Sequence, residues 1–305
     1  PPRSTLFPYT TLFRSIKNQR DYKLNYEIKN SFIKAKIKSF GAELNSLQKI
    51  DEDLEYIWQG NPKYWARHSP VLFPIVGRLK DDSYFYKNKK YNLSQHGVAR
   101  DKEFELLKKE HDFIEFSLKN DEETLKNYPF LFELNISYKL EKTKLIFSYK
   151  VKNRSEDRLY FSIGAHPAFN IASGDFLEFE NITSSKRYFL DDKGLIYKNE
   201  KLDFVENKLI LDEEIFKNDA LVFNDKNINS TNLKDKNNNK ILNIEFKDFP
   251  YLGIWSKPNL ARFVCIEPWF GVADEENSNQ NIEDKRGIQV LQKDDIFSCL
   301  YSIEV

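Results

Sequence analysis

Residues 32–38, Phe-Ile-Lys-Ala-Lys-Ile-Lys, alternate apolar side chains with lysine. Successive side chains of a strand point to opposite faces, so this stretch predicts a strand with one face in a core and the other in water. Segments of similar size follow at residues 103–109, 112–119, 130–140 and 144–152. With about twenty such segments at short spacing, the chain predicts an all-β fold, a large antiparallel β-sandwich with very little helix.

A few segments depart from simple alternation. Residues 71–76 are apolar on both faces apart from Pro74, which predicts a covered strand that bends at the proline. We expect a further strand at residues 54–58 and helical character only at 121–128, where an aspartate starts and a proline stops the segment. Residues 191–240 are expected to be rich in loops.

The first fifteen residues, PPRSTLFPYTTLFRS, differ in composition from the rest of the chain. They lack the Lys, Asn and Glu residues that are common in the rest of the chain, and they partly repeat themselves. The whole chain of 305 residues contains no methionine. We interpret residues 1–15 as a non-native segment of adapter or cloning origin, with a short native arm as the alternative. Residues 16–305 are then expected to form a single domain, because no linker composition divides them.

Charge and cysteine content exclude several classes of protein. The 47 basic residues balance the 47 acidic ones, which argues against nucleic acid or an anionic membrane as a partner. No apolar run is long enough for a membrane helix and no secretory signal is visible, so we expect a cytoplasmic protein. Cys265 and Cys299 are too few for a disulfide framework or a zinc site, and we interpret both as core residues.

Residues 78–101 contain two short aromatic segments joined by a charged tip. The pattern predicts a β-hairpin that returns Arg78 and His96 to the same end of the sheet. Gly97 follows His96 and permits a close approach of a ligand or of backbone. Among the other histidines, His111 is expected to be exposed, and His68 either lines a pocket or caps a loop.

Two polar residues end apolar strands just before a proline. His166 follows Phe-Ser-Ile-Gly-Ala and points away from the apolar face, and Glu267 follows a run that is apolar on both faces. A carboxylate in apolar surroundings is costly unless it is paired or useful. Burial would raise its pKa and make it a stronger base, although a buried pair with Arg78 or Arg262 is the alternative.

These residues fall in motifs that occur in a fixed order along the chain. The motifs are Pro70-Val71-Leu72-Phe73-Pro74-Ile75-Val76-Gly77-Arg78-Leu79, Gln95-His96-Gly97, Gly164-Ala165-His166-Pro167-Ala168-Phe169-Asn170, Cys265-Ile266-Glu267-Pro268 and Asp284-Lys285-Arg286-Gly287. The order of these motifs and their residues, over about residues 24–305, resemble the aldose 1-epimerase (galactose mutarotase) family, most nearly its LacX-like bacterial branch. The resemblance implies a β-supersandwich with an open cleft for a free sugar.

The resemblance also implies roles for individual residues. Glu267 looks like the general base that takes the anomeric hydroxyl proton, and His166 like the general acid that protonates the ring oxygen from the opposite side of the sugar. Arg78 and His96 would bind sugar hydroxyls. Asp219 lies in the interval where the family has a further sugar-binding aspartate, and Trp269 is our choice for a cleft wall.

Other readings stay open on sequence alone. Lys257 and Arg67 would recognise a phosphate if the protein were a hexose-6-phosphate 1-epimerase. A non-catalytic carbohydrate-binding or sugar-sensing protein of the same fold is a further class. We expect a small-molecule sugar substrate, no cofactor, no metal, and a monomer or homodimer. A metal site made of His96, His166 and Glu267 is the least favoured reading, because no close ligand pair supports it.

Overall fold

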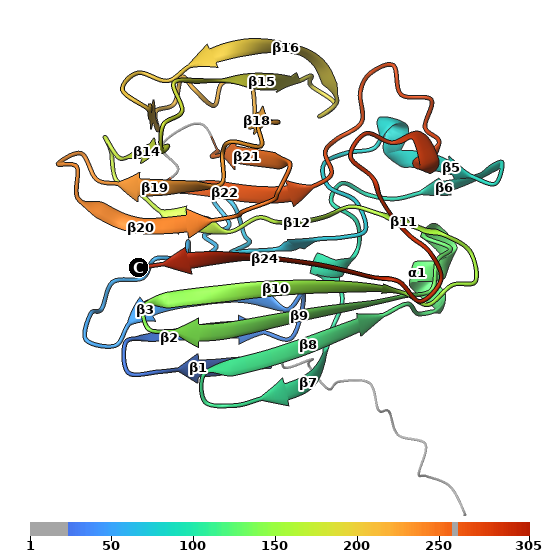
Figure 1. Ribbon diagram of the computed structural model, residues 1–305, viewed down its shortest axis with the longest axis horizontal. Helices are drawn as coiled ribbons and strands as arrows, with labels where there is room; N and C mark the ends of the chain where they lie inside the picture. The colour runs from blue at the N-terminus through green and yellow to red at the C-terminus, as the bar shows by residue number, and fades with distance from the viewer. Residues whose placement is uncertain (1–23, 258–261) are drawn as a thin grey trace, which may run out of the picture.

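The computed structural model describes residues 24–257 and 262–305, so the interpretation of residues 1–15 falls outside the described part of the chain. Strands dominate it, and all of the pairings between its strands are antiparallel (Figure 1). The α-helix that it contains is α1 (Glu122–Asn127), capped by Asp121, whose side chain accepts a hydrogen bond from the Thr124 N–H. The predicted antiparallel all-β fold is confirmed. No helix in the described residues is long and apolar enough to cross a membrane.

A nine-stranded sheet forms one layer. In spatial order its strands are β17 (Lys208–Ile210), β14 (Phe176–Glu178), β19 (Ser230–Lys234), β20 (Lys240–Glu245), β24 (Ile296–Glu304), β10 (Lys144–Asn153), β9 (Phe132–Glu141), β8 (Phe113–Lys119) and β7 (Glu105–Lys109). β9 and β10 pair over their whole lengths, from Lys144 opposite Glu141 to Asn153 opposite Phe132. The buried residues of β9 alternate with more exposed ones, as the sequence predicts.

A second sheet carries the strands that matter for the site. Its order is β16 (Ile196–Asp203), β15 (Ser184–Leu190), β18 (Leu221–Phe223), β21 (Tyr251–Trp255), β22 (Phe263–Phe270), β12 (Ile163–Ala165) and β4 (Val71–Leu72), with β13 (Ala168–Asn170) also paired to β22. β22 is buried along almost its whole length. Phe270 of β22 lies 4.9 Å, ring centre to ring centre, from Phe297 of β24, so the two sheets share a core.

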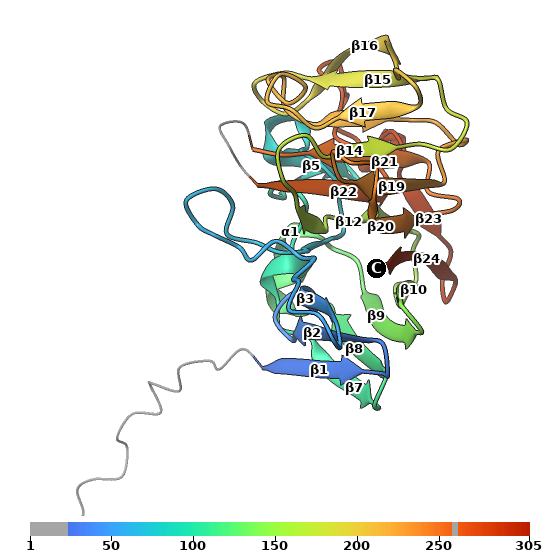
Figure 2. The same ribbon diagram turned by 90° about the vertical axis from the view of Figure 1, so that its left-hand side faces the viewer.

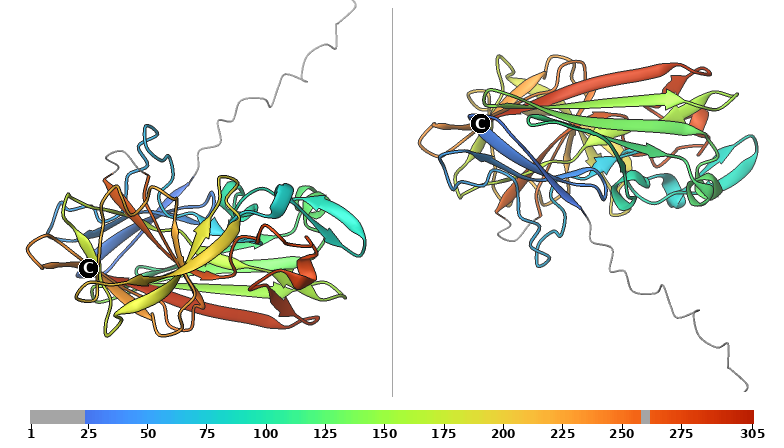
Figure 3. Two further views of the ribbon diagram at one scale, coloured as in Figure 1. Left: turned by 90° about the horizontal axis from the view of Figure 1, so that it is seen from above. Right: turned by 90° about the horizontal axis from the view of Figure 1, so that it is seen from below.

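Smaller sheets complete the fold. They are the three-stranded sheet β1 (Asn25–Lys29), β2 (Ile33–Lys38), β3 (Glu43–Lys49), the hairpin β5 (Ser83–Tyr86) and β6 (Lys89–Asn92), and the pair β11 (Leu159–Phe161) and β23 (Gln289–Leu291). Three short 3₁₀ helices join them, η1 (Lys80–Asp82), η2 (Ala99–Asp101) and η3 (Ile282–Asp284). The β1–β3 sheet lies beside the layer of β8 to β10 (Figure 2), where the Tyr138 hydroxyl donates to the Ala42 carbonyl. The predicted β5–β6 hairpin is confirmed and projects from one end of the molecule (Figure 3).

Two expectations for secondary structure were wrong. Residues 71–76 form only the two-residue strand β4, and residues 54–58 make an isolated bridge from Ile57 to Phe169 instead of a strand. Residues 191–240 are rich in loops, as expected, and the short strands β17, β18 and β19 and the longer β16 lie among them. β16 is exposed over most of its length, so its sequence has no alternation, and its strand form depends on pairing with β15.

A buried ion pair fixes the loop that follows β22. The Lys285 ammonium donates to Asp274 Oδ1 at 2.8 Å and to the Val272 carbonyl at 2.6 Å. The other carboxylate oxygen of Asp274 accepts from the Lys80 N–H at 3.0 Å, and the Asp274 N–H donates to the Arg78 carbonyl at 2.9 Å. The pair therefore ties the loop after β22 to the chain that leads into β5.

We predict that Lys285→Met lowers the free energy of unfolding by about 3–5 kcal/mol, because it leaves the buried Asp274 carboxylate without its cation. Urea denaturation measures the change. Lys293→Met is the matched control, since Lys293 pairs with Glu156 on the surface and exposed pairs contribute roughly 0–1 kcal/mol. Equal effects of the two substitutions would contradict the prediction.

Candidate active site

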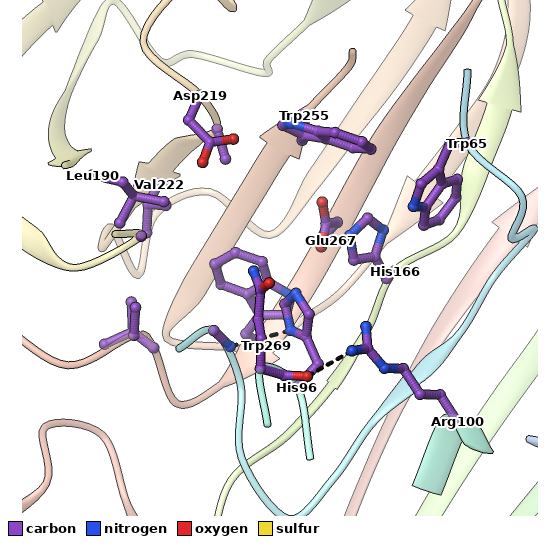
Figure 4. A pocket seen from close by; sticks show the side chains of 16 residues that line it. Trp65, His96, Arg100, His166, Leu190, Asp219, Val222, Trp255, Glu267 and Trp269 are labelled. Atoms are coloured by element: carbon purple, nitrogen blue, oxygen red, sulfur yellow. Dashed lines mark hydrogen bonds and ion pairs between the residues drawn. The ribbon is translucent and has the colours of Figure 1, made fainter. Parts of the chain in front are cut away.

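His166 and Glu267 meet inside the second sheet. Glu267 lies on β22, and His166 sits between β12 and β13, where Pro167 separates the two strands. The His166 Nε2 atom is 3.2 Å from Glu267 Oε2, and the residues are 8 % and 1 % exposed. Figure 4 shows the two side chains next to each other. The sequence leads us to expect an acid and a base on opposite sides of the sugar, whereas these two groups stand side by side.

Burial shifts the pKa of both members of this pair toward the neutral form. Desolvation lowers the pKa of His166 to about 3, and the nearby positive charges of Arg100 and Arg67 act in the same direction. Desolvation raises the pKa of Glu267 well above its usual value, and the negative charge of Asp219 adds to the effect. The directions agree, so the resting pair favours a neutral imidazole and a protonated carboxyl.

His96 is held by backbone in one orientation. Its own φ is 66° and that of Gly97 is 72°, and a Cβ on Gly97 would lie 2.3 Å from the Phe73 carbonyl oxygen, so only glycine fits there. His96 Nδ1 accepts from the Gly77 N–H at 3.2 Å. Burial, followed by the charges of His166 and Arg100, lowers the pKa of His96 well below its usual value. The neutral ring therefore carries its proton on Nε2 and offers a hydrogen-bond donor.

Three tryptophans surround the catalytic candidates. Trp65 stacks on the His166 ring at 4.8 Å and 25°, and Trp255 meets the same ring edge-on at 5.9 Å. Trp269 donates from Nε1 to the Ala165 carbonyl at 3.2 Å. A Cβ at Gly164 or at Gly253 would come within 2.5 Å of the Trp269 ring, so both neighbouring strands need glycine beside it. These rings cover the pair and form an aromatic wall of the site.

A cavity of about 300 Å³ opens beside this pair. Five of the six residues chosen from the sequence line it, namely His96, His166, Asp219, Glu267 and Trp269. Asp219 precedes β18 in a left-handed conformation with φ of 64°. The volume is at the small end of ligand pockets, which suits a single small polar ligand.

Arg78 does not line the cavity, contrary to the role that the resemblance gave it. Its Nε donates to Asp82 Oδ1 at 2.9 Å and the side chain is 40 % exposed. Gly77 has φ of 71°, and the chain turns so that the guanidinium leaves toward Asp82. Gly77 itself, rather than Arg78, faces the cavity.

Arg100 is the cation that sequence reasoning missed. It lies on η2 and lines the cavity, with one Nη donating to the Gln95 carbonyl at 2.7 Å (Figure 4). Its Nε is buried and makes no hydrogen bond within the described residues. The signal available in the sequence was its place three residues after Gly97, where one short turn brings it back toward His96.

The remaining candidates lie elsewhere. His68 does not line the cavity: its Nδ1 is 3.3 Å from the Lys38 ammonium and its backbone N–H donates to Glu43 Oε1, which fits the loop-capping interpretation. His111 is exposed, as expected. Cys265 is buried and Cys299 half-buried. His96 is not part of a possible metal-ligand group in the described residues, so the His96, His166, Glu267 site is not supported.

Comparison with known proteins agrees with this geometry. The profile of the aldose 1-epimerase family matches residues 25–284. The chain belongs to the aldose 1-epimerase family. It is 31 % identical over 300 residues to the plasmid-encoded protein LacX of Lactococcus lactis, covering 92 % of this chain and 99 % of LacX. The predicted membership of this family and the similarity to LacX are confirmed.

Solved structures of family relatives have the same fold. A galactose mutarotase related enzyme from Lactobacillus acidophilus superposes with a TM-score of 0.87 at 35 % identity, covering 92 % of this chain and 97 % of that one. A galactose mutarotase-like protein from Lactobacillus casei gives a TM-score of 0.86 at 29 % identity, covering 92 % and 99 %. The galactose mutarotase-like all-β architecture is therefore shown.

We predict that Glu267→Gln stabilises the protein at alkaline pH. Because the folded state raises the Glu267 pKa, stability falls as pH rises from the ordinary glutamate value of 4.5 through the raised value, and glutamine removes that loss. Each tenfold change in the ionisation constant is worth about 1.4 kcal/mol. Urea denaturation between pH 5 and pH 9 should show a gain that grows with pH. Glu105→Gln, on the surface, is the control, and a gain independent of pH would refute the assignment.

Proposed function

We propose that this protein is an aldose 1-epimerase that interconverts the α and β anomers of a free hexose. The observation that carries the proposal is the 3.2 Å contact between His166 and Glu267 at the wall of a small cavity. The anomeric hydroxyl oxygen and the ring oxygen are both bonded to C1. Two adjacent protein groups, rather than two opposed ones, suit two adjacent oxygens.

The reaction needs one proton to leave and one to arrive. Glu267 takes the proton of the anomeric hydroxyl while His166 gives a proton to the ring oxygen, the bond from C1 to the ring oxygen breaks, and an open-chain aldehyde forms. Rotation about C1–C2 and the reverse transfers close the ring as the other anomer. The raised pKa of Glu267 and the lowered pKa of His166 favour a proton on Glu267 in the resting pair, and its shift to His166 creates the acid and the base together.

The rest of the lining binds the sugar in this proposal. His96 donates from Nε2 to a sugar oxygen, and the Asp219 carboxylate accepts from sugar hydroxyls. Trp255 and Trp269 offer apolar faces for the C–H side of the ring. Arg100 supplies N–H donors in the position that the resemblance assigned to Arg78.

One observation favours a second candidate, a hexose-6-phosphate 1-epimerase. Arg100 lines the cavity, and Arg67 is near enough that its charge lowers the pKa of both His96 and His166. An anionic substituent on the sugar would suit these two guanidinium groups. Asp101 lies between them, 2.9 Å from Arg67 Nη2 and 3.6 Å from Arg100 Nε, and offsets one of the two charges. This offset makes the free hexose our first choice.

We predict that His166→Asn and Glu267→Gln each slow anomer exchange by about 10²- to 10⁴-fold, because each removes one proton-transfer group. NMR exchange spectroscopy between the α and β anomers of glucose and galactose measures the rate. His111→Asn and Glu105→Gln change the same residue types on the surface and should leave it unchanged. Unchanged exchange in both cavity variants would remove the proposed acid and base. Sugar binding without exchange in the wild type would instead indicate a carbohydrate-binding protein.

We predict that Arg100→Gln lowers kcat/KM for glucose and for glucose 6-phosphate by similar factors of about 10 to 100, the value of a charge-assisted hydrogen bond. A similar loss is expected if Arg100 binds a hydroxyl common to both sugars. Steady-state rates on the two sugars, with Arg154→Gln on the surface as control, test this. A loss confined to glucose 6-phosphate would show that Arg100 reads the phosphate and would favour the second candidate.

A further inference from the structure

Cys265 lies directly behind the catalytic candidates. It is on β22 two residues before Glu267, so both side chains lie on the same face of the strand, and it pairs across to Ala168, two residues after His166. The thiol is fully buried. One imidazole nitrogen of His166, the Cys265 sulfur and one Glu267 oxygen all lie within 4.8 Å of one another.

We propose that His166, Cys265 and Glu267 form a binding site for a thiophilic divalent cation such as Zn²⁺, and that occupation of this site shuts the enzyme off. Thiolate, imidazole and carboxylate are the three ligand types that Zn²⁺ takes from proteins. Glu267 Oε2 is buried and makes no hydrogen bond within the described residues, although His166 Nε2 lies 3.2 Å from it. A buried carboxylate oxygen without a hydrogen-bond donor, beside an imidazole and a thiol, fits a missing cation.

The spacing is close to what a tetrahedral site needs. Metal–ligand bonds of about 2.0–2.3 Å put neighbouring ligand atoms roughly 3.3–3.7 Å apart. The His166 Nε2 to Glu267 Oε2 distance of 3.2 Å is close to this range, and the Cys265 sulfur lies within 4.8 Å of a Glu267 oxygen and of an imidazole nitrogen of His166. The fourth position faces the cavity, where water can complete the shell. The Asp219 carboxylate is close enough to raise the pKa of Glu267 and adds negative charge.

Binding involves no change of oxidation state. The Cys265 S–H bond breaks, its proton and the proton shared by His166 and Glu267 go to solvent, and bonds from sulfur, nitrogen and oxygen to the cation form. The cation then holds the lone pairs that proton transfer to and from the sugar requires. The inhibition rests on the proposed function, whereas the binding does not.

Co²⁺ titration of the metal-free full chain tests the binding without reference to activity. Co²⁺ replaces Zn²⁺ in such sites, and a cobalt–thiolate bond gives an intense charge-transfer absorption. We expect this absorption to saturate at one Co²⁺ per chain in the wild type and in Cys299→Ser, and to be lost in Cys265→Ala. A wild type without the thiolate absorption, or an absorption that depends on Cys299, would overturn the proposal.

A second arm measures inhibition. Zn²⁺ should slow anomer exchange, EDTA should restore it, and Mg²⁺ at equal concentration should have no effect because it prefers oxygen ligands. Inhibition is measured relative to the metal-free rate of each variant. The Zn²⁺ inhibition constant should be at least about tenfold higher in Cys265→Ala than in the wild type, because loss even of an outer-shell partner lowers metal affinity by about 10- to 100-fold. Equal inhibition of Cys265→Ala and wild type would overturn the inhibitory role. An inactive wild type that still shows the cobalt–thiolate absorption would refute the epimerase and leave the metal site standing.

Discussion

The burial of the His166–Glu267 contact is the constraint on which the rest of the structure depends. In water, a carboxyl group and an imidazole 3.2 Å apart would favour their charged forms, and burial is the largest of the effects that move both toward their neutral forms. That burial is supplied by β22, which is covered on both faces, and by the ring of Trp65 against His166. The packing of the second sheet thus buries the pair of side chains that shares one proton.

The aromatic wall in turn restricts the strands beside it. The Trp269 ring occupies the space over Gly164 and Gly253 on the two flanking strands, so three positions on three strands must change together or not at all. The buried Asp274–Lys285 pair fixes another part of the cavity lining, because it joins the loop carrying Val272 and Ala273 to the chain beside Gly77. Core packing and a buried ion pair therefore both hold the lining in place.

Much of the fold and of the candidate site was predictable, for reasons that individual residues make clear. Strands with one solvent-exposed face, such as β2 and β9, can be recognised by the alternation of apolar and polar residues. β16 is exposed over most of its length, so its sequence shows no such alternation. His166 and Glu267 were found because polar residues ending apolar strands are unusual. The direction of Arg78 was not predictable, since it depends on the positive φ of Gly77 and on capture by Asp82, and Arg100 reaches the cavity only through a single 3₁₀ turn. Such turns depend on tertiary contacts that a linear pattern does not contain.

Strand β24 has a consequence for how the protein is made. It is the last strand of the chain, yet it lies in the middle of the nine-stranded sheet, between β20 and β10. Until residues 296–304 leave the ribosome, β10 and β20 both present open edges, and the two halves of that layer cannot join. The edge of β10 is therefore unpaired from the time residues 144–153 are made, and that of β20 from residue 245 on, so both edges are open to association with other strands until β24 closes them.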